Sequence, residues 1–415
     1  MRPQSGNHQL NCNLRTRIAG MAFALWLCAA ISVEAQTYQL LHGFTDFGGD
    51  TYEPLSGLTI DAGGNLYGTT YFDGDHGLGS GSVFRLSRKG TGWIYTPLHV
   101  FHFSTTDGAD PGARVIFGPD GSLYGSTVSG GAYGFGTVFQ LRPSVRACQT
   151  ALCPWTLDLL YSFNNYDGCS PNEIAFDRSG NIYGTTEQCG PNSEGTLYEL
   201  VHSGGSWTFQ LLHAFDASTG YPLTGVVTDQ GGNLYGTTAS TVYEYTTSAQ
   251  FEVLHKFSNN EGIGIYSGMV LDQAGNLYVQ ASNGGADGGG AVSQLSPSAD
   301  GWTLNTLYSF SSGGLCDGVL GSSDLSMDAA GNLYGTTFCK GAYGYGNVFK
   351  LSPSNGGWNY TSLYDFCSGG YPCSDGERPF TNVVLDSKGN LYGAVAEGVN
   401  SNDPLGGGGV WQIAP

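Results

Sequence analysis

The stretch Asp328-Ala329-Ala330-Gly331-Asn332-Leu333-Tyr334-Gly335-Thr336-Thr337 follows a pattern that recurs along the whole chain. Complete or nearly complete copies of this D-x-x-G-N-L-Y-G-T-T pattern surround Tyr67, Tyr183, Tyr235 and Tyr334, and weaker copies surround Tyr124, Tyr278 and Tyr392. Successive tyrosines in these seven copies are 43–59 residues apart. Repeats of this length, rich in glycine and aromatic residues and without helical periodicity, are typical of β-propeller blades. The pattern therefore predicts an all-β, seven-bladed propeller.

Each repeat contains four strand-like runs, which indicate four antiparallel strands per blade. A short apolar run such as Leu58-Thr59-Ile60 ends in a D-x-x-G-N turn, whose Asp can accept backbone N–H bonds and whose Gly suits a left-handed conformation. The second run is N-L-Y-G-T-T, and the third is V-F-x-L, as in 83–86. The fourth is W-x-x-x-x-L-[H/Y]-x-F, as in 207–215, where alternating side chains place one face against the next blade.

The two ends of the repeat array predict how the ring closes. The last repeat contains its first three strands and stops near Ile413, while residues 38–44 form a fourth-type strand that belongs to no preceding repeat. Pairing of strand 38–44 beside Val410–Ile413 would complete the seventh blade and leave no unpaired edge. Residues 36–415 are therefore expected to form a single domain.

Residues 1–35 have the pattern of a secretory signal peptide. Arg15 and Arg17 precede an apolar run from Ile18 to Val33, and Val33-Glu34-Ala35 offers a small-x-small cleavage site. We expect a secreted protein, extracellular or periplasmic, and find no anchor pattern. The net charge of −19 argues against nucleic acid or an anionic membrane as partner, since both attract basic surfaces.

The repeat pattern, together with G-G-A-Y-G-x-G-x-V-F-x-L at 130–141 and its relatives, resembles the Gloeo-Verruco (GloVer) tandem repeat of bacterial exported proteins. The resemblance covers residues 37–415. It implies a propeller-like exported protein and carries no established activity, cofactor or site residue.

Eight cysteines lie outside the predicted signal peptide, an even number that suits disulfide formation in an oxidising compartment. Cys169 and Cys316 each follow a fourth strand, and Cys189 and Cys339 each follow a second strand of the same blade. Because those loops are expected on one face, we predict the disulfides Cys169–Cys189 and Cys316–Cys339. Two local disulfides, Cys148–Cys153 and Cys367–Cys373, complete the set.

The recurring polar and aromatic residues are interpreted mainly as scaffold. His42, His99, His213 and His255 occupy the slot where other blades have Tyr161, Tyr308 and Tyr364. A catalytic histidine should break the repeat instead of following it, and no motif for nucleophilic or metal-dependent catalysis is present. The repeated tryptophans are expected to pack between blades. Ca²⁺ is the one candidate cofactor, with Asp73, Asp75, Asp107 and Asp110 as candidate ligands in acidic glycine-rich loops.

The loops between second and third strands offer the candidate ligand-binding residues. Ala132-Tyr133-Gly134-Phe135 and Ala342-Tyr343-Gly344-Tyr345 place pairs of aromatic rings among glycines, a pattern suited to stacking on sugars. The alternative is that these rings pack on neighbouring loops. The preferred interpretation is a monomeric binding module for an extracellular glycan or protein. The alternatives are a lactonase-, lyase- or glycosidase-like enzyme acting at a channel mouth, which would need a non-repeated cluster of ionisable residues there, and a structural envelope protein.

Overall fold

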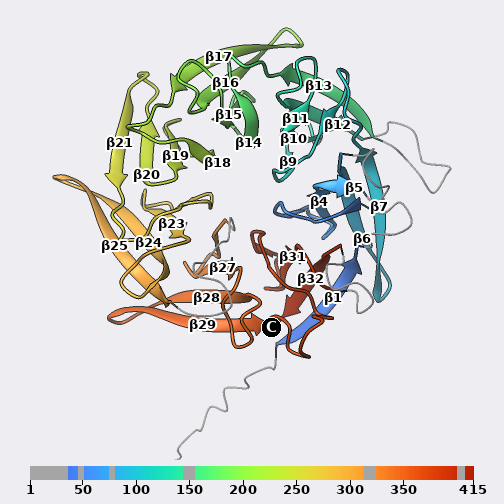
Figure 1. Ribbon diagram of the computed structural model, residues 1–415, viewed down its shortest axis with the longest axis vertical. Coiled ribbons are helices and arrows are strands. Elements are labelled where there is room, and N and C mark those ends of the chain that lie inside the picture. The colour runs from blue at the N-terminus through green and yellow to red at the C-terminus, as the bar shows by residue number, and fades with distance from the viewer. Residues whose placement is uncertain (1–35, 45–50, 74–79, 144–154, 313–323, 400–406) are drawn as a thin grey trace, which may run out of the picture. The chain divides into compact units, whose positions relative to one another are not determined.

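The computed structural model describes residues 36–44, 51–73, 80–143, 155–312, 324–399 and 407–415. The unit Gln36–Pro415 is a seven-bladed β-propeller, with seven four-stranded antiparallel sheets around a central axis (Figure 1). No helix occurs within the described ranges. The fold prediction is confirmed, and its physical basis is the repeat: each copy forms one sheet whose two faces are buried by neighbouring sheets.

In six blades the strands are arranged outward from the axis in chain order, and in the seventh the outermost strand is the first strand of the chain. The innermost strands are β3 (Thr59–Ile60), β9 (Ile116–Phe117), β14 (Cys169–Phe176), β18 (Pro222–Thr228), β22 (Val270–Leu271), β26 (Ser326–Met327) and β30 (Val384–Leu385). The second strands, which contain the L-Y-G-T-T pattern, are β4 (Leu66–Thr70), β10 (Leu123–Thr127), β15 (Ile182–Gln188), β19 (Leu234–Thr238), β23 (Leu277–Ala281), β27 (Leu333–Thr337) and β31 (Leu391–Val395).

The outer two strands of a blade are consecutive in the chain, except in the blade that joins the two ends of the unit. The third strands are β6 (Ser82–Lys89), β12 (Thr137–Arg142), β16 (Thr196–Ser203), β20 (Thr241–Tyr245), β24 (Gly288–Ser298), β28 (Asn347–Ser354) and β32 (Gly409–Ala414). The rim strands are β7 (Gly92–Val100), β13 (Thr156–Ser162), β17 (Ser206–Ala214), β21 (Phe251–Lys256), β25 (Gly301–Ser311), β29 (Gly357–Asp365) and β1 (Thr37–Gly43). Two small ribbons, β2 (Thr51–Tyr52) with β5 (Phe72–Asp73) and β8 (Gly108–Ala109) with β11 (Ser129–Gly130), lie in the loops.

The seventh blade closes as predicted. Strand β1 pairs antiparallel with β32, from Thr37 opposite Ala414 to Gly43 opposite Gly409, and so provides the rim strand of the sheet β30-β31-β32-β1. In Figure 1 the blue β1 lies beside the red β32. Phe44, the last residue of the predicted strand, follows β1 and is buried in the core shared with the first blade.

Blades are held together by the repeated aromatic residues. Each repeated tryptophan lies against the repeat tyrosine of the preceding blade, as in Tyr67–Trp155 and Tyr124–Trp207, with ring centroids 6.4 and 6.5 Å apart. Rings of the [H/Y] slot also cross between blades: His42 stacks on Tyr95 at 4.6 Å. The expectation that the repeated tryptophans pack between blades is confirmed.

The two threonines of the G-T-T pattern have different partners. The second threonine bonds to the third strand of its own blade, as in Thr127 Oγ1 to Thr137 Oγ1 at 2.8 Å. In most copies the first bonds to the next blade, as in Thr336 Oγ1 donating to the Pro379 carbonyl oxygen at 2.9 Å. The pattern therefore satisfies buried polar groups both within and between blades.

Candidate functional site

One position of the repeat lines the central channel and differs from blade to blade. It immediately precedes a buried apolar residue that lies in the innermost strand or just before it, such as Val115 before β9 or Leu325 before β26. The seven equivalent residues all line one cavity of about 420 Å³: Gly57, Arg114, Glu173, Gly225, Gly268, Asp324 and Asn382. Four blades therefore place a polar or charged side chain at the axis, and three place a glycine there.

The glycines leave the space that the larger side chains occupy. A Cβ on Gly268 would lie 2.6 Å from Asp324 Oδ1, and one on Gly57 would lie 2.3 Å from Asn382 Oδ1. The Asn382 side chain uses that space to accept a hydrogen bond from the Leu58 backbone N–H at 2.9 Å. The arrangement at the axis is thus a packed set of unlike residues in a scaffold that otherwise repeats.

Arg114 and Glu173 form an ion pair in this cavity. Arg114 Nε donates to Glu173 Oε1 at 3.0 Å, and Nη2 donates to the same oxygen. The Arg114 side chain is 28% exposed and the Glu173 side chain is 23% exposed, because both face the channel although protein surrounds them. Burial opposes the charge on Arg114, but the carboxylates of Glu173 and Asp324 outweigh it and raise the pKa of the guanidinium.

Asp324 completes the group from the opposite part of the ring. Its Oδ1 accepts the backbone N–H of Gly268, and its side chain lines the same cavity as Glu173 and Arg114. Burial, followed by the charge of Glu173, raises the pKa of Asp324 to about 7, although Arg114 and the Gly268 N–H act in the other direction. A carboxyl group of this kind can hold or release a proton near neutral pH.

The remaining cavity wall mixes aromatic and polar groups. Tyr71, Tyr266 and Phe380 contribute rings, and Asn172 and Thr224 contribute hydrogen-bonding side chains. Because Tyr71 directly follows the second strand β4, the cavity lies at the end of the channel where the second strands finish. That end carries the loops from second to third strands and from blade to blade, which is the face that the sequence favoured for function.

The predicted aromatic residues lie on that face but outside the cavity. Tyr133 and Tyr343 are 63% and 50% exposed, and the Tyr345 ring lies 6.2 Å from that of Tyr371 in the following inter-blade loop. The Tyr133–Phe135 loop precedes β12 and the Tyr343–Tyr345 loop precedes β28, which are in blades that are not neighbours (Figure 1). The structure therefore forms two separate aromatic patches, and their role in binding stays a prediction.

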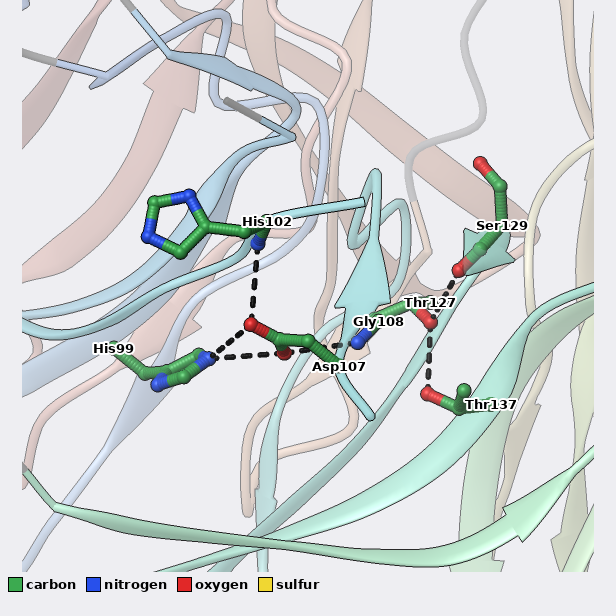
Figure 2. A network of polar contacts seen from close by, with 7 residues as sticks. All are labelled: His99, His102, Asp107, Gly108, Thr127, Ser129 and Thr137. Carbon is green, nitrogen blue, oxygen red and sulfur yellow. Dashed lines mark hydrogen bonds and ion pairs between the residues drawn. The ribbon is translucent and has the colours of Figure 1, made fainter. Parts of the chain in front are cut away.

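The candidate metal ligands have other partners where they can be described. Asp107 accepts bonds from His99 Nε2 at 3.1 Å and from the backbone N–H groups of His102 and Gly108, as Figure 2 shows. Asp110 accepts a bond from the Ser129 hydroxyl. The side chain of Asp73 and the whole of Asp75 lie outside the described residues. In the part of the chain that is described, no group of three or more His, Cys, Asp or Glu side chains is placed to hold a metal ion.

Two of the predicted disulfides are present. Cys169 is bonded to Cys189, and Cys367 is bonded to Cys373. Cys339 is also disulfide-bonded, while its predicted partner Cys316 and the predicted pair Cys148–Cys153 lie outside the described residues. Disulfides of this kind are typical of proteins that fold outside the cytoplasm.

The channel residues were not among the sequence-predicted site residues, although a signal for them exists. Aligning the seven repeats one position before the buried residue of the first strand yields Gly, Arg, Glu, Gly, Gly, Asp and Asn. That position breaks the repeat in the way expected of a functional site.

Comparison with known proteins identifies the family and supports the fold. The family model of the Gloeobacter/Verrucomicrobia repeat matches residues 28–153 and 239–415, and the chain belongs to this family. No curated protein sequence matches the chain.

Among solved structures, virginiamycin B lyase from Staphylococcus aureus is similar with a TM-score of 0.57 and 12% identity, over 92% of this chain and 99% of that chain. The extracellular domains of the putative hybrid two-component systems BT3049 and BT4673 from B. thetaiotaomicron have TM-scores of 0.54 and 0.53 at 13% identity. They align with 91% and 90% of this chain and with 41% and 39% of their own chains. At these identities the likeness concerns the fold alone. None of the residues described forms a helix long and apolar enough to cross a membrane.

Proposed function

We propose that this protein is exported and binds an extracellular glycan, with one end of the sugar chain held in the cavity at the channel mouth. The observation that carries the proposal is the channel-lining position, where Arg114, Glu173, Asp324 and Asn382 replace glycine in four blades. A scaffold role alone does not require unlike charged residues at equivalent positions. Export is supported by the disulfides and by the signal-like segment 1–35.

The size and lining of the cavity fit a sugar. Its volume of about 420 Å³ lies within the range of small-molecule sites, about 300–1,000 Å³. Sugars present hydroxyl groups at their edges and C–H groups on their faces. Carboxylates, an amide and a guanidinium can bond the hydroxyls, while the rings of Tyr71, Tyr266 and Phe380 can pack on the faces.

The exposed aromatic patches are the second candidate site. Tyr133, Phe135, Tyr343 and Tyr345 lie on the same face, and the exposure of Tyr133 and Tyr343 favours a surface for stacking. These patches would suit a long glycan chain or an extracellular protein partner, whereas the cavity suits a chain end.

A glycan array on the purified protein, with and without Ca²⁺, would identify the ligand. Affinities of the best glycan are then compared for two matched double variants: Tyr71→Ala with Tyr266→Ala in the cavity, and Tyr133→Ala with Tyr343→Ala on the loops. We expect the cavity variant to lose at least about tenfold in affinity, as loss of a central aromatic contact typically does. The loop variant should bind like wild type.

Loss of affinity in the loop variant, with unchanged affinity in the cavity variant, would place the binding site at the aromatic patches instead. Absence of glycan binding by the correctly folded wild-type protein would contradict the proposal. Melting temperatures of all variants serve as the folding control.

A further inference from the structure

We infer that the glycan is a linear chain of equatorially linked sugar units, which leaves the cavity along a row of aromatic rings over the sixth blade. This inference rests on the proposed function, since it extends the same site. The first ring of the row lines the cavity, and each further ring is reached through a direct contact. This aromatic row consists of Phe380, Phe338, Tyr345 and Tyr371.

The row begins at the cavity with two half-buried phenylalanines. Phe338 directly follows the second strand β27 of the sixth blade, and Phe380 lies in the loop from β29 to β30 of the seventh blade. Their ring centroids are 4.5 Å apart, with an angle of 45° between the ring planes. Two loops therefore meet beside the cavity, and each contributes one ring there.

Arg378 connects these phenylalanines with the outer pair of rings. Its guanidinium carbon lies 5.4 Å from the centre of the Phe338 ring, and its backbone N–H donates to the Tyr345 carbonyl oxygen at 3.0 Å. An ion pair between Nη1 and Glu397 holds the side chain in place. Because a guanidinium has five N–H donors, Arg378 can also donate to the hydroxyls of a sugar that lies on the row.

The outer pair of rings is accessible but fixed in position. The Tyr345 and Tyr371 rings are stacked with centroids 6.2 Å apart, and Tyr371 is 58% exposed. Tyr371 lies inside the short loop closed by the Cys367–Cys373 disulfide. The Asp375 carboxylate also accepts the Cys367 backbone N–H, at 3.0 Å. An exposed ring on a loop held in this way loses little conformational freedom when a ligand binds, which suits it for ligand contact.

A row of rings that leads out of a cavity favours one class of glycan. In an extended chain with equatorial linkages, such as a β-1,4-linked glucan, every sugar unit keeps a flat C–H face available, and successive faces can stack on successive rings. A helical chain, such as an α-1,4-linked glucan, turns its faces progressively away from a straight row. The row therefore selects an extended chain whose end enters the cavity.

The inference is tested by titrating the purified protein with cellobiose, cellohexaose and maltohexaose. We expect wild type to bind cellohexaose at least about tenfold more tightly than cellobiose, because a central aromatic contact typically contributes about that factor. Maltohexaose should bind no more tightly than cellobiose. Tyr371→Ala should remove most of the gain with chain length and leave the affinity for cellobiose unchanged. Tyr133→Ala removes a similarly exposed ring from the second blade and should behave like wild type.

The dependence on chain length separates this inference from the proposed function. Equal affinities of wild type for cellobiose and cellohexaose, or a Tyr371→Ala variant that keeps the full gain, would overturn the row and leave binding in the cavity standing. Loss of the gain in Tyr133→Ala, tight binding of maltohexaose, or binding of neither cello-oligosaccharide by a protein that binds another glycan would do the same. Absence of binding to every glycan would overturn both. Melting temperatures show whether the variants are folded.

Discussion

At the scale of single residues, the [H/Y] slot shows how two unlike side chains serve one purpose. His99 Nε2 bonds to Asp107 at 3.1 Å, and in another blade the Tyr364 hydroxyl donates to Asp375 Oδ2 at 2.7 Å. In both cases a ring at the end of the rim strand forms a hydrogen bond with an aspartate carboxylate of the following loop. In these two blades histidine and tyrosine have the same role, because each offers a flat ring with a polar atom at its far edge.

This equivalence predicts the outcome of three substitutions at one blade. His99→Tyr should change the free energy of unfolding by less than about 1 kcal/mol, since the hydroxyl can replace Nε2. His99→Phe should cost about 1–2 kcal/mol, because half-buried Asp107 loses a partner. His102→Phe is the control, since only the backbone of His102 contacts Asp107. Urea unfolding measures all three, and equal stability of the tyrosine and phenylalanine variants would refute the shared role.

At the scale of secondary structure, β1 is the element on which closure depends. Its backbone pairs with β32, the Tyr38 ring stacks on Tyr364 at 4.2 Å, and the Tyr38 hydroxyl donates to the Asp375 carbonyl oxygen at 2.6 Å. Strand β1 therefore joins the seventh blade to the sixth as well as covering an edge.

Deletion of residues 36–45 should expose the edge of β32 and remove Phe44 from the core that it shares with the first blade. We expect aggregation or strong destabilisation, because an exposed strand edge pairs readily with other chains. Light scattering and thermal melting detect both effects. Tyr38→Phe, which keeps the ring and removes one hydrogen bond, should stay as soluble as wild type. A soluble deletion variant of unchanged stability would be incompatible with the closure described.

At the scale of the whole molecule, the turn aspartates couple folding to pH. Asp328 accepts bonds from two backbone N–H groups, from Asn332 Nδ2 and from the Tyr334 hydroxyl, with distances of 2.7–3.1 Å. Burial raises the pKa of Asp328, but these bonds outweigh it, so its pKa lies below the ordinary value. The same net lowering occurs in four other blades, at Asp61, Asp120, Asp272 and Asp386.

Lowered carboxyl pKa values predict acid sensitivity. A group with a lower pKa in the folded state stabilises the fold above its unfolded pKa, about 3.9, and this contribution is lost as the pH falls through the folded value. The melting temperature should therefore drop between about pH 5 and pH 2. Asp328→Asn should be less stable at pH 7 and show a shallower drop, whereas Asp300→Asn, at an exposed hairpin turn, should follow wild type. A flat profile for wild type would contradict this account.

The fold was predictable because its information is local and repeated. The D-x-x-G-N turn and the G-T-T pattern recur with the same partners in most blades, so each copy reinforces the interpretation of the others. The candidate site is different. Arg114, Glu173 and Asp324 are far apart in sequence, and only convergence of three blades at the axis makes them a cluster. Tyr133 and Tyr343 occupy equivalent positions in an alignment of the repeats, which suggests a single site. In the propeller, however, they lie in two blades that are not neighbours.

The pairing of β1 with β32 also determines the order in which the ring can be completed. A chain that emerges from a ribosome or a membrane channel presents β1 first, and β1 has no partner until β32 has emerged. The other six sheets can form as their own strands appear, so the nascent protein resembles an open stack of blades with one loose strand. Completion of the ring is thus a late event, and the interval before it is when chaperones or proteases have access to an uncovered blade edge.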